Sequence, residues 1–382
     1  RFAYFTQFGS GNSYGFGPNG NLVYGIRETL LGSDKLTWEK SYKTNIGLEM
    51  MLWGKLNLTL DYYWERRKDI LIQRSSLPSM AGFDASIYAN MGEMDNKGVD
   101  ANLEYQTRIG NKVGLRLFGN LTYSKNKIVF RDEPAMQYAY QKSEGTRYGE
   151  FYGYIAEGYF QSEEEIKKSP RQMRELAPGD IKYKDLNDDG VIDANDQCYL
   201  GKSWFPSWSY GMGFNINYHN FDLALFFQGV SDVSIMANGG SIDTGNGDWG
   251  ASGVGIVPFT GMGLNPSNVI TKALDRWTAD NPRADAWYPR MTANATTNDN
   301  NYVNSTHWLK DGSYLRLKQA SLGYTLENKK LMDKGIEYLY FYLSGQNLLT
   351  FSKFKLWDPE LGSNGAKYPL SRMVTLGMRV SF

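Results

Sequence analysis

Apolar and polar side chains alternate with a period of two along many stretches of this chain. Residues 45–53 are typical, because their apolar members all fall on one face of an extended backbone: Ile46, Leu48, Met50 and Leu52. Successive side chains of a β-strand point to opposite faces of a sheet, so this period predicts strands rather than helices. The pattern resumes at residues 56–65 after Gly54 and Lys55, and the two stretches therefore predict a hairpin with a tight turn.

Further stretches alternate in the same way along the rest of the chain. They cover residues 99–105, 113–123, 210–218, 221–227, 314–326, 337–347 and 374–382. From residue 41 onward the pattern predicts nine strands, and the aromatic-rich first residues are a candidate for a tenth. Short turns follow Trp53, Thr107, Tyr218 and Leu326, whereas long loops follow Glu65, Ser124, Val230 and Asn347. Short turns on one side and long loops on the other are typical of a bacterial outer-membrane barrel.

The predicted strand lengths also fit a membrane. Strands of about 10–12 residues can cross a hydrocarbon layer of roughly 30 Å at a tilt. Aromatic residues near the predicted strand ends would form the girdles at the two interfaces. Examples are Trp53, Trp64, Tyr105, Tyr123 and Tyr218. The predicted fold class is therefore all-β, a transmembrane antiparallel β-barrel, and a soluble sandwich with the same alternation is the alternative that periodicity leaves open.

Composition narrows the classes of protein further. Aromatic residues make up 15% of the 382 residues and there are 41 glycines, which favours strands and turns. No run of about 18 apolar residues is present, so no membrane-spanning helix is predicted. A formal net charge of zero argues against a nucleic-acid binder, and the lone Cys198 excludes an intramolecular disulfide. The sequence starts at Arg1 with neither an initiator Met nor a signal segment. Either a leader was removed by processing or this is an excerpt of a longer protein, and we expect the excerpt.

Six sequence phrases occur in the order in which SusC/RagA-like transporters carry them. They are LTWEKSYKTNIGLEM from Leu36, LDYYWERRKDIL from Leu60, NKGVDANLEY from Asn96, PGDIKYKDLNDDGVIDANDQ from Pro178, GSYLRLKQASLGYTL from Gly312 and LSGQNLLTFSKF from Leu343. The final MRVSF is similar to the aromatic-ended signal by which such barrels are recognised for assembly. The whole chain thus resembles the C-terminal barrel portion of a TonB-dependent outer-membrane transporter of the SusC/RagA-like class.

The resemblance implies a 22-stranded barrel filled by an N-terminal plug, energised by TonB and capped by a SusD-like surface lipoprotein. Residues 1–382 would supply about ten of those strands, so the plug is not expected in this chain and the missing strands are expected upstream of Arg1. The implied location is the outer membrane of a bacterial cell. Long loops would then be extracellular, and the short turns and the C-terminus would be periplasmic. The implied cargo is a glycan or an oligopeptide.

One motif has the spacing of a cation-binding loop. It matches D-x-N-x-D-G-x-I-x-x-x-D, with candidate ligands Asp185, Asn187, Asp189, the carbonyl of Val191, and Asp196. Oxygen ligands at these positions wrap one hard cation, and Gly190 permits the sharp turn, so calcium fits best. Asp196 stands where an EF-hand has Glu, as in dockerin-type variants. The alternative is an acidic surface turn without metal.

This motif lies in a predicted long extracellular loop, residues 125–207, for which a structural calcium ion would act as a brace. Ser162 and Glu165 form a capping box. Ile166 and the later Met173 and Leu176 predict a short amphipathic helix that Pro170 would break. Aromatic residues of the long loops are candidates for stacking on sugar rings or packing against a lid protein, and equally for loop cores or girdles. They are Trp204, Trp208, Trp249, Trp287, Tyr288 and Trp357.

No arrangement of residues predicts catalysis. His219 falls in a predicted tight turn and His307 in a long loop, and no carboxylate pair has the spacing that a glycosidase requires. We therefore predict import of a glycan or oligopeptide, with no covalent chemistry. The alternatives are a barrel of the same family that acts as a scaffold in an outer-membrane assembly, and a secreted β-rich carbohydrate-active enzyme.

Overall fold

The computed structural model of the protein describes residues 4–18, 20–76, 85–110, 112–238, 270–291, 300–333, 335–365 and 368–382. The chain forms two compact units. Unit 1 comprises residues 1–45, 63–97 and 125–148, and unit 2 comprises residues 46–62, 98–124 and 149–382. Several long strands pass through both units, and each unit is described below by itself. No helix among the described residues is long and apolar enough to cross a membrane.

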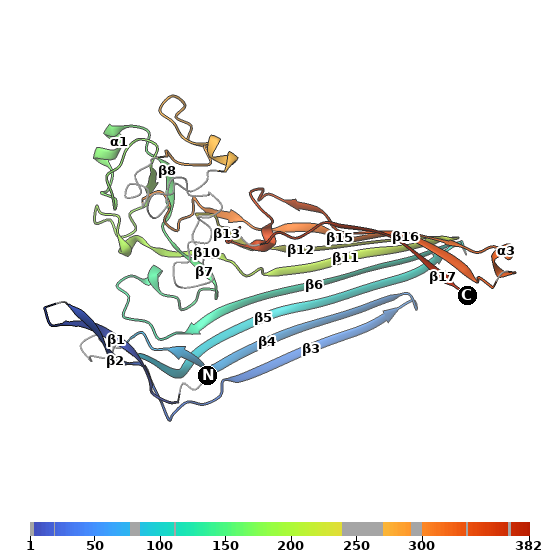
Figure 1. Cartoon of the computed structure of the whole chain (residues 1–382), viewed down its shortest axis with the longest axis horizontal. Helices are drawn as coiled ribbons and strands as arrows, with labels where there is room; N and C mark the ends of the chain where they lie inside the picture. Colours follow the sequence, from blue (N-terminus) through green and yellow to red (C-terminus); the bar gives the residue numbers. More distant parts are fainter. Residues whose placement is uncertain are drawn as a thin grey trace. The chain divides into compact units, whose positions relative to one another are not determined.

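Unit 2 is built on long strands that follow one another in the sheet in chain order (Figure 1). They are β3 (Lys40–Leu52), β4 (Leu56–Gln73), β5 (Ser86–Ile109), β6 (Val113–Phe130), β11 (Trp208–Tyr218), β12 (Phe221–Ser231), β15 (Tyr314–Leu326), β16 (Tyr338–Ser352) and β17 (Met373–Ser381). From β6 to β17 all neighbours pair antiparallel. These are the nine strands that the alternating pattern predicts, so the predicted all-β class is confirmed.

The register of this sheet sorts side chains into apolar and polar rows. One row across six strands holds Leu115, Ile216, Leu223, Leu322, Leu343 and Leu376. The adjacent row, on the opposite face, holds Arg116, Asn215, Ala224, Ser321, Ser344 and Thr375. Leu376 is 80% exposed. A continuous apolar face of this kind would be unfavourable in water and suits contact with lipid, whereas the polar face suits an aqueous interior.

Unit 1 contains the hairpin of β1 (Gln7–Phe16) and β2 (Asn21–Leu31), which pair antiparallel. Gly17 and Gly20 have positive φ angles of 74° and 61°, which glycine adopts without steric cost, and they allow the chain to reverse. The sequence offers one candidate strand in this region, and the structure shows two. Residues 125–130, at the start of the predicted long loop, instead belong to β6, and Ile128 N–H donates to the carbonyl of Thr146 at 2.9 Å.

The loop module of unit 2 comprises residues 149–207, 232–238, 270–291 and 300–313. It contains three small two-stranded sheets and several short helices. Its strands are β7 (Glu150–Gly153), β8 (Ala156–Tyr159), β9 (Ile181–Tyr183), β10 (Cys198–Ser203), β13 (Ser234–Met236) and β14 (Leu309–Asp311), and its helices are α1 (Glu163–Lys168) and 3-10 turns at Ala194–Asp196 and Thr271–Leu274. Outside it, short helices lie at Ala139–Gln141, Lys329–Met332 (α3) and Pro359–Leu361.

Helix α1 forms where the capping signal predicts it. The Ser162 hydroxyl accepts the Glu165 backbone N–H at 3.2 Å. The Glu165 carboxylate accepts the N–H of Gln161 at 2.8 Å, one residue before the position that a capping box uses. The helix ends at Lys168, before Pro170, and none of its residues is buried. A short helix at the capping signal is therefore confirmed, but the predicted apolar members Met173 and Leu176 lie beyond it and are not helical.

Candidate functional site

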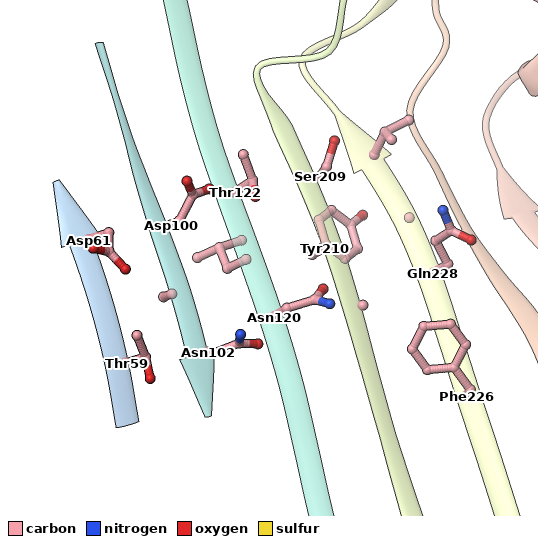
Figure 2. Close-up of a pocket in the computed structure, with 15 residues that line it drawn as sticks. Thr59, Asp61, Asp100, Asn102, Asn120, Thr122, Ser209, Tyr210, Phe226 and Gln228 are labelled. Carbon is pink, nitrogen blue, oxygen red and sulfur yellow. The ribbon is translucent and has the colours of Figure 1, made fainter. Parts of the chain in front are cut away.

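The polar face of the strands is hollowed in unit 2 by a pocket of about 530 Å³. Its polar lining comes from β4, β5, β6, β11 and β12 and includes Thr59, Asp61, Asp100, Asn102, Asn120, Thr122, Ser209 and Gln228 (Figure 2). Asn120, Gly211 and Gln228 lie in one register row. A Cβ on Gly211 would lie 2.8 Å from the Asn120 side-chain oxygen and 3.1 Å from the Phe226 ring, so glycine allows these side chains to approach.

Gly213, two residues further along β11, also lies where strands pack closely. A Cβ on Gly213 would lie 2.6 Å from the Leu225 carbonyl and equally near the Phe118 ring. Farther along the same face, Arg116 Nε donates to Glu104 at 2.7 Å. The face therefore offers carboxylates, amides and hydroxyls to a polar solute over several strands.

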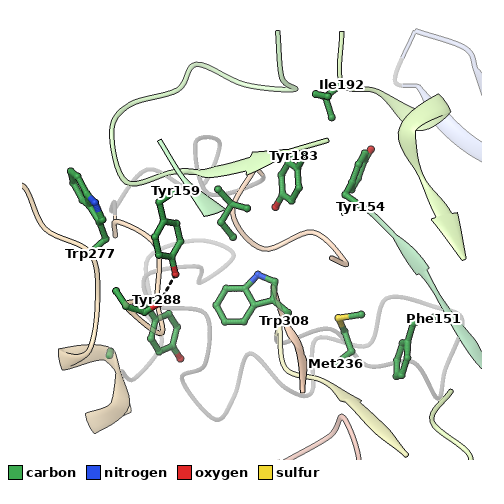
Figure 3. Packing of buried hydrophobic residues seen from close by; sticks show 12 residues of the cluster. Phe151, Tyr154, Tyr159, Tyr183, Ile192, Met236, Trp277, Tyr288 and Trp308 are labelled. Atoms are coloured by element: carbon green, nitrogen blue, oxygen red, sulfur yellow. Dashed lines mark hydrogen bonds between the residues drawn. The ribbon is translucent and has the colours of Figure 1, made fainter. Parts of the chain in front are cut away.

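The loop module has a hydrophobic core of its own (Figure 3). Trp308 is fully buried, and its ring packs edge-on against Tyr288 with centroids 5.6 Å apart. Trp308 Nε1 donates to the carbonyl of Asn301 at 2.7 Å, and the Tyr159 hydroxyl donates to the carbonyl of Ala286 at 2.8 Å. These contacts join segments that are far apart in the sequence, so the loops form a packed body rather than separate tethers.

A buried polar network runs through this core. Asp180 is fully buried, and its carboxylate accepts the side-chain amide of Asn301 at 2.8 Å, Arg290 Nη2 at 2.9 Å and the N–H of Ala177 at 2.9 Å. Arg290 Nε lies 2.7 Å from the same carboxylate as an ion-pair contact. Asn300 and Gln172 join the network through an amide–amide bond of 2.8 Å. Satisfied buried networks of this kind fix one arrangement of the chain.

Some of the aromatic residues predicted in the long loops are packed in hydrophobic cores, and others are partly exposed. Tyr288 is buried in the core, and Trp287 packs against it. Trp357 packs on a second small core formed by Ile235, Ala237 and Phe354. Trp204 and Trp208 are each 37% exposed, and Trp249 lies outside the described residues.

The calcium-type motif forms a tight turn closed by its own side chains. The Asp185 carboxylate accepts the N–H groups of Asp188 at 2.7 Å and Gly190 at 2.8 Å. Buried Asp196 accepts the N–H groups of Leu186 at 2.7 Å and Asp193 at 2.8 Å. Asn187 and Asp189 bond to each other at 2.8 Å. Within the described ranges, no three acidic, His or Cys side chains converge as metal ligands.

Sequence reasoning missed Asp180, Arg290, Asn300, Asn301 and Lys310. No local pattern marks the network, because its partners are separated by more than a hundred residues. The adjacent pair Asn300–Asn301, in a segment that also carries Trp308, was the only available signal that amides would be needed to satisfy buried polar groups.

His307 belongs to the loop module. Its Nε2 lies 3.1 Å from the carbonyl oxygen of Trp287. Burial, together with the charge of Lys310, lowers the pKa of His307 to about 4. In the unfolded chain the pKa of His307 is about 6.5. Between about pH 4 and 6.5 the unfolded chain therefore binds this proton more readily than the folded chain does. We therefore expect the module to lose about 2–3 kcal/mol of stability as the pH falls from 7 to 4.5.

Hydrogen exchange of module peptides, corrected for the intrinsic pH dependence of exchange, measures this loss. His307→Gln should remove most of the pH dependence. His219→Gln, at an exposed turn with φ 53°, is the matched control and should leave it intact. Equal pH dependence in the wild type and His307→Gln would contradict the assignment to His307.

Three comparisons with known proteins agree. Residues 2–348 match the family described as TonB dependent receptor-like, beta-barrel. The chain is 28% identical over 389 residues to TonB-dependent receptor P3 of Formosa agariphila, covering 94% of this chain and 36% of that protein. It is 23% identical over 395 residues to TonB-dependent receptor SusC of Bacteroides thetaiotaomicron, covering 100% and 36%. The chain thus spans about a third of the length of these relatives.

Among solved structures, the chain resembles that of the RagAB peptide transporter with a TM-score of 0.71 and 21% identity. The superposition covers 100% of this chain and 39% of that one. A likeness at this identity concerns the fold, which agrees with the long antiparallel strands described above.

Proposed function

Because the chain belongs to the TonB-dependent receptor-like β-barrel family, we propose that the whole protein imports a glycan or an oligopeptide across the bacterial outer membrane. The family membership confirms the predicted SusC/RagA-like resemblance and the absence of enzymatic chemistry. The observation that carries the proposal is the two-faced sheet, in which one face is continuously apolar and the other is polar. Such a wall separates lipid from an aqueous path.

In this proposal the described strands form part of the barrel wall, and the polar pocket on β4, β5, β6, β11 and β12 lies along the cargo path. The loop module and residues 125–207 are extracellular, and the short turns and C-terminus are periplasmic. A SusD-like lipoprotein acts as lid, and TonB acts through a plug domain supplied by the rest of the protein. The total of 22 strands stays a prediction.

Mass spectrometry of the intact full-length receptor, extracted in detergent with its partners, tests the proposal first. We expect a SusD-like subunit and a retained glycan or oligopeptide. Uptake of that compound into cells should then depend on the receptor and on TonB. A complex that retains no small molecule and whose loss leaves uptake of glycans and peptides unchanged would favour a scaffold role. A monodisperse protein that needs no detergent would favour a secreted enzyme.

We also propose that the motif from Asp185 to Asp196 binds one structural calcium ion. The candidate ligands are Asp185, Asn187, Asp189, the Val191 carbonyl and Asp196. Each carboxylate oxygen has more than one lone pair, so the backbone hydrogen bonds of the turn are compatible with metal ligation. The positive φ of 82° at Gly190 supports the sharp turn that such a loop needs.

Chelation is therefore expected to loosen residues 185–196 without unfolding the strands. Hydrogen exchange with calcium or with a chelator should show roughly tenfold faster exchange in this segment after metal removal, equal to about 1.4 kcal/mol of local stability. Asp189→Asn should weaken the calcium effect, whereas Asp188→Asn, at a position that supplies no ligand, should keep it. Global melting after chelation, or exchange that ignores calcium, would contradict the structural role.

A further inference from the structure

A second pocket of about 900 Å³ lies between the loop module and the stretch after β16, and four segments of the chain line it. They are residues 270–275, Trp287, residues 310–311 and the stretch after β16 that includes residues 353–357 and Gly365. All belong to unit 2. Segments from such distant parts of the sequence create a defined concavity rather than a groove along one strand.

The walls of this pocket are aromatic and aliphatic, and their positions are fixed. Trp357 Nε1 donates to the carbonyl of Gly362 at 2.9 Å, and the Trp357 ring meets Phe354 edge-on at 4.7 Å between centroids. A Cβ on Gly365 would lie 2.5 Å from the Trp357 ring, so that ring rests directly on backbone. Leu274, at the rim, is 77% exposed. An apolar group of a ligand would find preformed surfaces here.

Two lysines of the pocket, Lys310 and Lys355, have no carboxylate within ion-pair distance among the described residues, and of these only Lys310 is partly buried, since Lys355 is exposed. Lys310 Nζ donates to the carbonyl of His307 at 2.6 Å and lies 5.2 Å from the centroid of the Trp287 ring. No carboxylate in the described part of the chain is within ion-pair distance of it. Burial, with the positive charge of Lys272, lowers the pKa of Lys310 to about 8. A half-buried ammonium with unfilled donor capacity is stabilised by an anion placed against it.

The carboxylates of the pocket, in contrast, already have cations. Asp275 pairs with Lys272 at 2.8 Å and also with Arg283. Asp311 accepts the N–H of Ser313 at 2.9 Å and lies 3.9 Å from Lys353. Their negative charges are therefore partly compensated, and the uncompensated charges are those of the exposed Lys355 and of Lys310, which is held against the Trp287 ring.

The apolar walls and the partly buried Lys310 ammonium favour some classes of ligand over others. The two tryptophans could stack on the face of a sugar ring, but Leu274, Leu356 and Phe354 would desolvate its hydroxyl groups, and the carboxylates that could accept from those hydroxyls already have cations. A ligand with an apolar body and one anionic group fits better. We infer that this pocket binds the C-terminal residue of an oligopeptide, with its carboxylate on Lys310 and an apolar side chain between Trp287 and Trp357. This inference rests on the proposed import function and narrows its cargo to oligopeptides.

The test uses the full-length receptor in detergent and two probes, the N-acetylated tetrapeptide Ala-Ala-Ala-Leu with a free C-terminal carboxylate and the same peptide as its amide. Isothermal titration should show about tenfold tighter binding of the acid, as expected for a charge-assisted hydrogen bond. Lys310→Met should abolish that preference and leave the affinity for the amide unchanged, which also shows that the pocket still folds. Lys184→Met, an exposed lysine of the module outside the pocket, should keep the preference.

Equal binding of acid and amide to the wild type, or a preference that survives Lys310→Met, would overturn the inference. Loss of the preference in Lys184→Met as well would also count against it, because the effect would then not belong to the pocket. The outcome is separable from the import proposal. Peptide uptake without a preference for the free carboxylate would support the import proposal and contradict this site. A preference for the free carboxylate without peptide uptake would support this site and contradict the import proposal.

Discussion

Replacing Asp180 with alanine should destabilise the loop module by about 3–5 kcal/mol, the range found when one partner of a buried ion pair is removed. Asp180 is fully buried, and three groups donate to its carboxylate: the Asn301 amide, Arg290 and the Ala177 N–H. Alanine leaves all three donors without that acceptor, and it leaves the Arg290 charge without compensation. The strands of the sheet make none of these contacts and should keep their stability.

Hydrogen exchange of module peptides and limited proteolysis measure this loss. Asp285→Ala is the matched control, because Asp285 belongs to the same module, pairs with Arg283 at 3.2 Å and has a side chain that is 85% exposed. An exposed pair of this kind should change stability by less than about 1 kcal/mol. Arg290→Met combined with Asp180→Ala should be less destabilised than the sum of the two single changes. Equal exchange in Asp180→Ala and Asp285→Ala would refute the role of the network.

Arg316→Met should release the loop between β16 and β17 at a similar cost of about 3–5 kcal/mol. Arg316 is 1% exposed, and its guanidinium donates to both oxygens of Asp358 at 2.6 and 2.7 Å and to Glu360 at 3.2 Å. The Tyr314 hydroxyl donates to Glu360 at 2.6 Å. Methionine keeps much of the side-chain volume but leaves two neighbouring carboxylates that repel each other.

Proteolysis and exchange in residues 353–365 should therefore rise sharply in Arg316→Met, while β15 and β16 stay protected. Arg316→Lys should fall in between, because an ammonium keeps the charge but loses the two-pronged contact with Asp358. Lys318→Met in the same strand is the control and should behave as the wild type does. An unchanged loop in Arg316→Met would show that Arg316 does not anchor the loop.

The strands could be predicted because the information that specifies them is local. In β11, Met212, Phe214 and Ile216 alternate with residues of the polar face, and burial of one face fixes the register. The short turn at His219 was predictable for the same reason, since the two flanking patterns stop on either side of it. The family phrases then placed the strands in a known type of barrel.

The loop module could not be predicted from local patterns. Its core joins Tyr159 to Ala286 and Asp180 to Asn301, pairs with long sequence separations and no shared period. The motif from Asp185 to Asp196 was visible because its chemistry is contained in twelve consecutive positions. The Lys310 pocket was not, because its lining depends on how four distant segments pack.

The register of the sheet specifies the strands, whereas the loop module packs around its own core. This difference affects which substitutions the protein tolerates during evolution. A substitution in the strands shifts contacts along a whole row, since each residue faces a partner on both sides. Leu274 and Lys353, by contrast, are exposed at the pocket rim. They can vary with little effect on the buried Trp308 and Asp180, since the contacts described above for those two residues come from other parts of the module. If the pocket binds cargo as proposed, substitutions at its exposed rim could change the ligand preference while the strands of the sheet are conserved.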